Sequence, residues 1–328
     1  MSSDFLLRRR ALSGLAAIAC TALAGPARAQ QTRIVRMVVP FGTGAVQDTV
    51  ARAFSAELGQ ALGGASVVVE NRAGAGGTVG SAYVAKAPAD GNTLVLAAAS
   101  HHIADHLYAK LPYRPLQDFV GIAQVGTADY VIAAAANMPG VATLADFVRE
   151  VKSKPGQYNY ASAGNGSATH LAMASFLAKA GLEMTHIPMK STGEAVNEVL
   201  AGRVQAVASS SIGVIGLQAD PRVRLLAGTG KVRSAFLPQL PTVAEAGVPG
   251  YVFDSWIGVL APAATPPAEM ERLNAAINKV MAEPAIQERF KRLGVEPRST
   301  GAAAFAQLLR ADWETMAVVV KSSGARIE

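Results

Sequence analysis

The stretch Arg33–Arg72, RIVRMVVPFGTGAVQDTVARAFSAELGQALGGASVVVENR, predicts a strand, a helix and a second strand. Its first run is rich in β-branched residues and continues to Phe41, which is typical of a strand buried in a parallel sheet. Two glycines then end a helix whose apolar residues recur at helical spacing, namely Val46, Val50, Phe54, Leu58 and Leu62. The order strand, helix, strand predicts a right-handed crossover between parallel strands.

The same alternation continues along the chain. A glycine-rich loop with a short helix (74–91) and a buried strand (92–100) complete a βαβαβ block. A second block follows, in which Thr143 caps a helix and Asp146 holds the reciprocal capping-box position. Further strands are expected at 129–136, 158–162, 183–190, 203–211, 223–230 and 254–263. Helices are expected after 166 and at 192–202, and three polar-faced helices close the chain from about 267, around 285–294 and at 301–321.

Two such blocks predict an α/β protein with two lobes, each a mainly parallel sheet flanked by helices. If the strand at 254–263 returns to the first lobe, the chain crosses between the lobes twice, which favours a hinge and a cleft. We expect this arrangement, with 30–127 and 255–328 in lobe 1 and 128–254 in lobe 2. Two serial domains with one crossing are the alternative.

Residues 1–29 are predicted to be a signal peptide. LLRRR forms a basic n-region, ALSGLAAIACTALAG an apolar h-region, and Ala27-Arg28-Ala29 matches the cleavage rule. Cleavage leaves 26 basic and 23 acidic side chains and removes the only cysteine, Cys20. We therefore expect an exported protein with no cysteine chemistry and no nucleic-acid partner. The partial twin-arginine pattern leaves both Sec and Tat export open.

The motif YASAGNGSATH, Tyr160–His170, carries hydroxyls and a histidine but lacks the spacing of known catalytic loops. Neither Ser162 nor Ser167 stands in a Gly-x-Ser-x-Gly elbow, and the Gly-Lys-Ser/Thr ending of a phosphate loop is missing. A secreted hydrolase that uses either serine with His170 is kept as the alternative function.

Two other motifs also favour structural roles. SHHIADH groups possible metal ligands, namely His101, His102, Asp105 and His106, but the His-Glu-x-x-His spacing of zinc sites is absent. The segment Ala73–Gly80 does not match the Gly-x-Gly-x-x-Gly nucleotide fingerprint, so a tight glycine turn is the better interpretation. We expect no metal and no cofactor.

Two glycine-containing loops between a strand and a helix indicate an anion site. The first amides of a helix have no internal partner, and the helix dipole makes that end partly positive. Phe41–Gly44 and Ser162–Gly166 both precede a helix, and glycine allows close approach of a ligand. One loop from each lobe is expected to bind a small carboxylate from opposite sides of the cleft.

Long stretches of the mature chain resemble the periplasmic receptors of tripartite tricarboxylate transporters, the Bug family. They include IVRMVVPFGTGAVQDTVAR, VVVENRAGAGGTVGSAYVAKAPADGNTLVLAAAS, LYAKLPYRPLQDF, KPGQYNYASAGNGSATHLA and LPTVAEAGVPGYVFDSWIGVLAPAATPPAEMERLN. The resemblance implies a two-lobed periplasmic-binding-protein fold that closes like a Venus flytrap. It also implies a small carboxylate ligand and delivery to a membrane permease.

The chain departs from the family pattern where the ligand is expected. In the first loop Gly42 replaces a proline and Ala45 replaces a glycine, while Met189 stands where an aromatic residue is common. Ser209 and Ser210 stand where an acid or amide is frequent, so an amino-acid ammonium group would lack a carboxylate partner. We therefore expect an organic acid, aliphatic or aromatic, rather than an amino acid.

The expected ligand-binding set is Phe41, Gly42, Thr43, Gly44, Asp48, Ser100, Ser162, Ala163, Gly164, Asn165, Gly166, His170, Met189 and Ser209. Of these, Asp48 is expected to hold the amides of its own loop rather than touch an anion. The protein is expected to be a monomeric, non-enzymatic receptor that works with permease subunits. A ligand-sensing subunit of a signalling system has the same sequence features.

Overall fold

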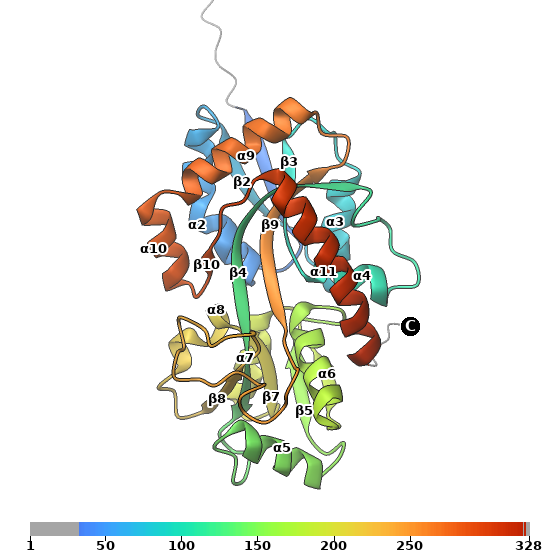
Figure 1. Cartoon of the computed structure of the whole chain (residues 1–328), viewed down its shortest axis with the longest axis vertical. Coiled ribbons are helices and arrows are strands. Elements are labelled where there is room, and N and C mark those ends of the chain that lie inside the picture. The colour runs from blue at the N-terminus through green and yellow to red at the C-terminus, as the bar shows by residue number, and fades with distance from the viewer. Residues whose placement is uncertain (1–32, 324, 326–328) are drawn as a thin grey trace, which may run out of the picture. The chain divides into compact units, whose positions relative to one another are not determined.

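The computed structural model of the chain describes residues 33–323 and 325 (Figure 1). The expected signal peptide, with its cleavage site and Cys20, lies outside these residues. Every described helix and strand belongs to one compact unit that begins at Ile34. Within the described residues, no helix is both long enough and apolar enough to cross a membrane.

The first sheet begins with three parallel strands, as the sequence predicts, and the structure places them in the order β2-β1-β3. These are β1 (Ile34–Val39), β2 (Ser66–Asn71) and β3 (Thr93–Ala98). The connections contain α2 (Val46–Ala61), and the 3₁₀ turn η1 (Ala75–Gly77) followed by α3 (Thr78–Ala85). Because side chains alternate along a strand, Val35, Met37 and Val39 join one core cluster and Val38 joins another.

Two antiparallel strands connect the first sheet to the second. They are β4 (Phe119–Ala135) and β9 (Asp254–Pro262). From Phe119 to Asp129, β4 pairs with β9, and from Tyr130 to Ala135 it pairs with β7 and β8. Figure 1 shows both strands running between the part of the molecule that contains β3 and the part that contains β5 and β7. The expected double crossing is therefore made by these two strands. The exact lobe boundaries stay a prediction, although β4 changes partners between Asp129 and Tyr130.

The second sheet contains the parallel strands β7, β5 and β6, in that order, with β4 antiparallel to β7. Its elements are α5 (Leu144–Ser153), β5 (Asn159–Ser162), α6 (Ala168–Ala180), β6 (Thr185–Pro188), α7 (Thr192–Leu200), β7 (Ala206–Ser210), α8 (Ser211–Val214), η2 (Ile215–Leu217) and β8 (Val223–Gly228). The predicted capping box of α5 is present, since Thr143 and Asp146 bond reciprocally.

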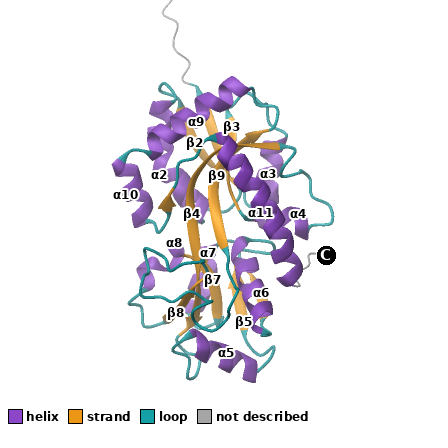
Figure 2. Cartoon of the chain, in the orientation of Figure 1, coloured by secondary structure: helices purple, strands orange, loops and turns teal. Residues whose placement is uncertain are grey.

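Helices flank both sheets (Figure 2). The C-terminal elements are α9 (Pro267–Met281), α10 (Pro284–Arg292), the short strand β10 (Glu296–Pro297) and α11 (Ala302–Ser323). Helix α11 packs in two places. Phe305 and Leu309 join the core of the first sheet, whereas Met316 and Val320 pack in the cluster that contains Leu171 of α6.

Two sequence expectations differ from the structure. The strand expected at 129–136 is longer in the structure and spans Phe119–Ala135. Its first half is hard to recognise in the sequence because Gly121 and Gly126 interrupt the strand pattern. The motif SHHIADH forms the helix α4 (Ser100–Leu107), which none of the helices expected from the sequence covers. His102 bonds to Asp312 of α11 at 2.6 Å, and this contact stabilises the helix against α11.

Candidate ligand-binding site

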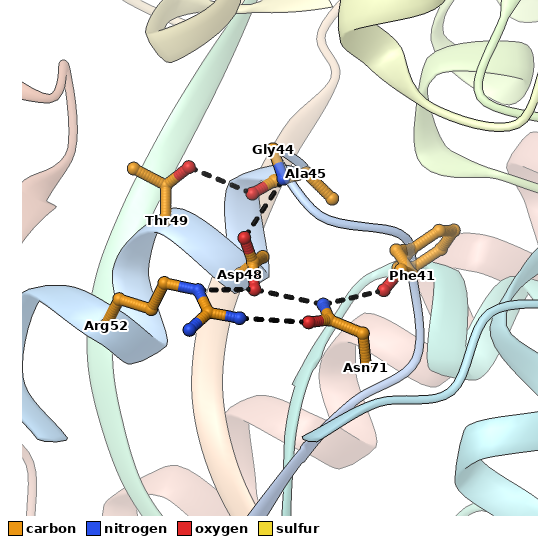
Figure 3. Close-up of polar contacts among 7 residues, drawn as sticks. All are labelled: Phe41, Gly44, Ala45, Asp48, Thr49, Arg52 and Asn71. Atoms are coloured by element: carbon orange, nitrogen blue, oxygen red, sulfur yellow. Dashed lines mark hydrogen bonds and ion pairs between the residues drawn. The ribbon is translucent and has the colours of Figure 1, made fainter. Parts of the chain in front are cut away.

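The loop between β1 and α2 is held by the carboxylate of Asp48 (Figure 3). The Gly44 amide donates to Asp48 Oδ2 at 3.0 Å, and Arg52 Nε donates to Asp48 Oδ1 at 2.9 Å. Asp48 itself is only 2 % exposed. The expectation that Asp48 holds its own loop therefore matches its hydrogen bonds.

Asn71, at the end of β2, completes this network from outside the loop. Its Nδ2 donates to Asp48 Oδ1 and to the Phe41 carbonyl, both at 3.0 Å, and Arg52 donates to its Oδ1 at 3.0 Å. Burial acts to raise the pKa of Asp48, but the hydrogen bonds from Arg52, Gly44 and Asn71 outweigh it. The pKa is lowered, so Asp48 is ionised at neutral pH.

Helix α2 starts without a side-chain cap. Its N-cap residue is Ala45, whose methyl group cannot accept the first amides of the helix. The only acid of the first turn, Asp48, is used by the loop as described above. The amides at Val46 and Gln47 are therefore left for a ligand or for water.

The second loop, after β5, is organised by Ser162 and a histidine from the neighbouring strand. Ser162 Oγ lies 2.6 Å from His186 Nε2 and accepts the Gly164 amide at 3.1 Å. The Ala163 amide donates to Thr169 Oγ1 at 2.9 Å. These bonds fix the loop on both sides of its glycine.

Helix α6 has a serine cap and a histidine in its first turn. Ser167 Oγ accepts the amide of His170 at 3.2 Å, and His170 Nδ1 accepts the Gly166 amide at 3.2 Å. His170 stacks on His186 with ring centroids 4.0 Å apart. Burial lowers the pKa of His170 to about 4. Burial, and then the charge of His170, lower that of His186 to about 3, so both rings are neutral at pH 7.

A small chamber of about 20 Å³ lies where four helices begin. Val46, Ser100, Ala168 and Thr192 are the first residues of α2, α4, α6 and α7, and all four line it. The complete lining is Phe41, Ala45, Val46, Gln47, Ser100, Tyr130, Ala163, Ser167, Ala168, Thr169 and Thr192. No residue of this lining is charged, so the dipoles of the four helices are the feature that would favour an anion here.

A wider cleft of about 720 Å³ adjoins the chamber, since Phe41 and Ala163 line both. The lining is Phe41, Gly42, Ala73, Gly74, Ala75, Gly76, Gly77, Tyr108, Ala163, Gly164, Asn165, Met189 and Lys190. It joins the two loops to the glycine-rich segment that precedes α3. A ligand that spans chamber and cleft would thus touch both halves of the molecule.

Glycines allow the walls of the cleft to meet. A Cβ placed on Gly76 would lie 2.5 Å from the Asn165 carbonyl oxygen, which is too close for any side chain. A Cβ on Gly77 would lie 3.2 Å from the Phe41 ring. The glycine-rich segment of the first half therefore packs directly on the second loop. This agrees with the close-approach role expected for these glycines.

The structure brings about half of the expected set into these two cavities. Phe41, Gly42, Ser100, Ala163, Gly164, Asn165 and Met189 line the chamber or the cleft. The other members, Thr43, Gly44, Asp48, Ser162, Gly166, His170 and Ser209, are absent from both linings, and their contact with a ligand stays a prediction. The expected set omits other residues of the linings, Tyr130, Thr192 and Ala75 among them, and it omits Asn71 and His186, which hold the two loops.

The polar side chains of α4 contact an aromatic residue and α11. His101 stacks on Tyr113, and His106 Nε2 lies 2.8 Å from the Trp313 carbonyl, while Asp105 accepts from the Trp313 indole at 2.8 Å. Within the described chain, no three His, Cys, Asp or Glu side chains gather into a group that could bind a metal ion. These polar residues join α4 to α11 and to the core.

A family model matches residues 49–324, and its description is "Tripartite tricarboxylate transporter family receptor". The match covers most of the chain.

Three solved structures are similar over nearly their full length. Rpa4515 of R. palustris, solved with adipate, is 30% identical with a TM-score of 0.85, covering 91% of this chain and 100% of its own. The periplasmic binding protein BugD is 32% identical with a TM-score of 0.84 and coverages of 90% and 99%. MatC from Rhodopseudomonas palustris, with bound malate, is 30% identical with a TM-score of 0.83 and coverages of 88% and 99%.

Proposed function

Because the chain belongs to the tripartite tricarboxylate transporter receptor family, we propose that it is a periplasmic solute-binding protein for a small organic acid. The acid would bind between the two loops, with its carboxylate directed at the chamber. The protein would then present the closed, loaded form to the permease subunits of its transporter.

The observation that carries this proposal is the meeting of four helix N-termini around one chamber that no charged side chain lines. Each N-terminus offers unpaired amides and a partial positive charge, so together they favour an anion. The narrow chamber favours a flat group such as a carboxylate. At about 20 Å³ it has room for one water molecule, so a carboxylate would enter as the loops adjust.

Adipate and malate in the two ligand-bound neighbours support a carboxylic acid as the class of ligand. The lining of this chain favours an acid without an amino group. Neither the chamber nor the cleft is lined by an aspartate or glutamate. A buried ammonium group would therefore lack the charged acceptor that it needs.

Binding without catalysis is the role that the serines support. Ser162 is fully buried, and His170 accepts the Gly166 amide instead of a serine hydroxyl. Ser162 does have a histidine partner, His186, but its hydroxyl also bonds within its own loop. We infer a receptor that needs no cofactor and acts as a monomer.

Native mass spectrometry of protein purified without denaturation tests the proposal. We expect a mass shift that matches a small organic acid, and titration calorimetry should then reproduce its binding. Tight binding of aspartate or glutamate with no binding of any organic acid would overturn the choice of ligand class. Ester hydrolysis that is lost in a Ser162→Ala variant would overturn the non-catalytic role.

A further inference from the structure

We propose that the ligand is an acid with an apolar body, an aromatic ring or a chain of similar size, and that this body lies against the walls of the 720 Å³ cleft while the carboxylate lies at the chamber. This inference rests on the proposed function and narrows its ligand class. It separates such acids from short, hydroxylated diacids like malate.

The size of the cleft is the first argument. Pockets of roughly 300–1,000 Å³ suit ligands with many more atoms than a four-carbon acid. The cleft measures about 720 Å³ and shares Phe41 and Ala163 with the lining of the chamber. A four-carbon diacid at the chamber would leave the apolar walls of the cleft to water. An apolar body would displace that water from apolar walls, which is favourable.

The chemistry of the walls is the second argument. The side chains of the lining are mostly carbon, from Phe41, Tyr108, Met189 and the methyl groups of three alanines. Met189 is a flexible, polarisable side chain that adapts to the edge of a ring or to a chain. Lys190 is the only charged residue of the lining. A second carboxylate on the ligand would thus find one cation at most.

The backbone of the glycine-rich segment is the third argument. Gly74, Ala75, Gly76 and Gly77 all have positive φ, at 145°, 45°, 65° and 101°. Ala75 is the only residue other than glycine with positive φ in the described chain. Such a conformation is costly for alanine and is found mainly where a site requires it. It gives the cleft a wall that is almost free of side chains, against which a flat or extended apolar body can lie.

A titration panel on the unmodified protein tests the proposal directly. Calorimetry would compare 3-phenylpropanoate and hexanoate with malate in the same buffer. We expect at least one of the apolar acids to bind at least tenfold more tightly than malate. Malate binding as tightly as both apolar acids, or more tightly, would overturn the inference and leave the proposed function intact. Binding of no acid in the panel, nor of adipate, would overturn both.

A methionine pair supplies a matched control. Met189→Gln places a polar group of similar size in the cleft, whereas Met184→Gln makes the same change in a partly buried methionine of the neighbouring core. We expect the first variant to weaken binding of the apolar acid about tenfold, or ~1.4 kcal/mol. Malate binding should weaken less than binding of the apolar acid. The second variant should bind both acids as the wild type does. Equal effects of the two variants on the apolar acid would contradict a role for Met189 in holding its body.

Discussion

Replacing Asp48 with asparagine tests whether the first loop depends on one ionised carboxylate. The side chain keeps its size, but one oxygen becomes an amide that cannot accept a hydrogen bond. Asp48 accepts from Gly44, Arg52 and Asn71. At least one of these donors therefore loses its acceptor in the variant.

The expected loss of stability depends on how exposed each of the three donors is. Arg52 has a side chain that is 51% exposed, so water replaces its lost partner at little cost. The half-buried Asn71 is less free to find water, and an unsatisfied buried donor costs ~1–3 kcal/mol. We expect the free energy of unfolding to fall by about 2 kcal/mol. Because the loop then loses its anchor, ligand affinity should fall about tenfold or more.

Urea denaturation and ligand titration of the variant are the measurements. Asp118→Asn is the control, since Asp118 accepts from Arg114 four residues earlier on an exposed surface. The pKa of Asp48 is lowered from 3.8, so its stabilising effect is present above that pH and is lost as the pH falls through the lower, folded-state value. The difference in free energy of unfolding between the wild type and Asp48→Asn should therefore shrink in strong acid. An Asp48→Asn variant with wild-type stability and affinity at pH 7 would refute the reasoning.

Three further changes test other parts of the site. Burial lowers the pKa of His170 from 6.5 to about 4. The unfolded chain therefore takes up a proton that the folded protein excludes, and stability should fall by up to ~3 kcal/mol between pH 6.5 and 4. The free energy of unfolding, measured by urea titration, should fall less steeply over this pH range in a His170→Gln variant. An equally steep fall would contradict this. Burial, then the aspartate opposite on β4, raise the pKa of Asp254 to about 6. Asp254→Asn should raise Tm at pH 7.5 but not at about pH 3, below the ordinary pKa of 3.8, and a gain at both values would exclude ionisation of Asp254 as its cause. Gly76→Ala would place a Cβ 2.5 Å from a carbonyl of the second loop, so ligand affinity should fall more than tenfold. Gly140→Ala, with a similar φ of +67° and open space, is its control and should bind normally.

Local pattern was sufficient to predict most of the elements and both loops. The apolar spacing of α2 and its terminal glycines lie within one stretch, and the buried residues Val50, Phe54 and Leu58 follow that spacing. The N-cap of α6 is equally local, because Ser167 is three residues from the amide that it accepts. Such features need no knowledge of the rest of the chain.

The missed residues depend on pairing between distant segments. Asn71 reaches Phe41 because β1 and β2 are parallel in a register that places Val39 beside Asn71. Likewise, His186 meets Ser162 because β5 and β6 are neighbours. Strand order and register are set by the whole sheet, so no motif in the sequence marks these partners. Ala75 is missed for a different reason, since alanine normally avoids positive φ.

The two attachments of α11 have a practical consequence. Asp312 and Trp313 bond the helix to α4, while Met316 and Val320 rest on the helix that starts at the second loop. Movement of that loop on ligand uptake would therefore change the surroundings of the last turns of α11. Val318 is 67% exposed on these turns, and Cys20 is the only cysteine of the chain and belongs to the expected signal peptide. A single cysteine introduced there would accept one fluorophore, which makes α11 a natural position for an optical reporter of ligand capture.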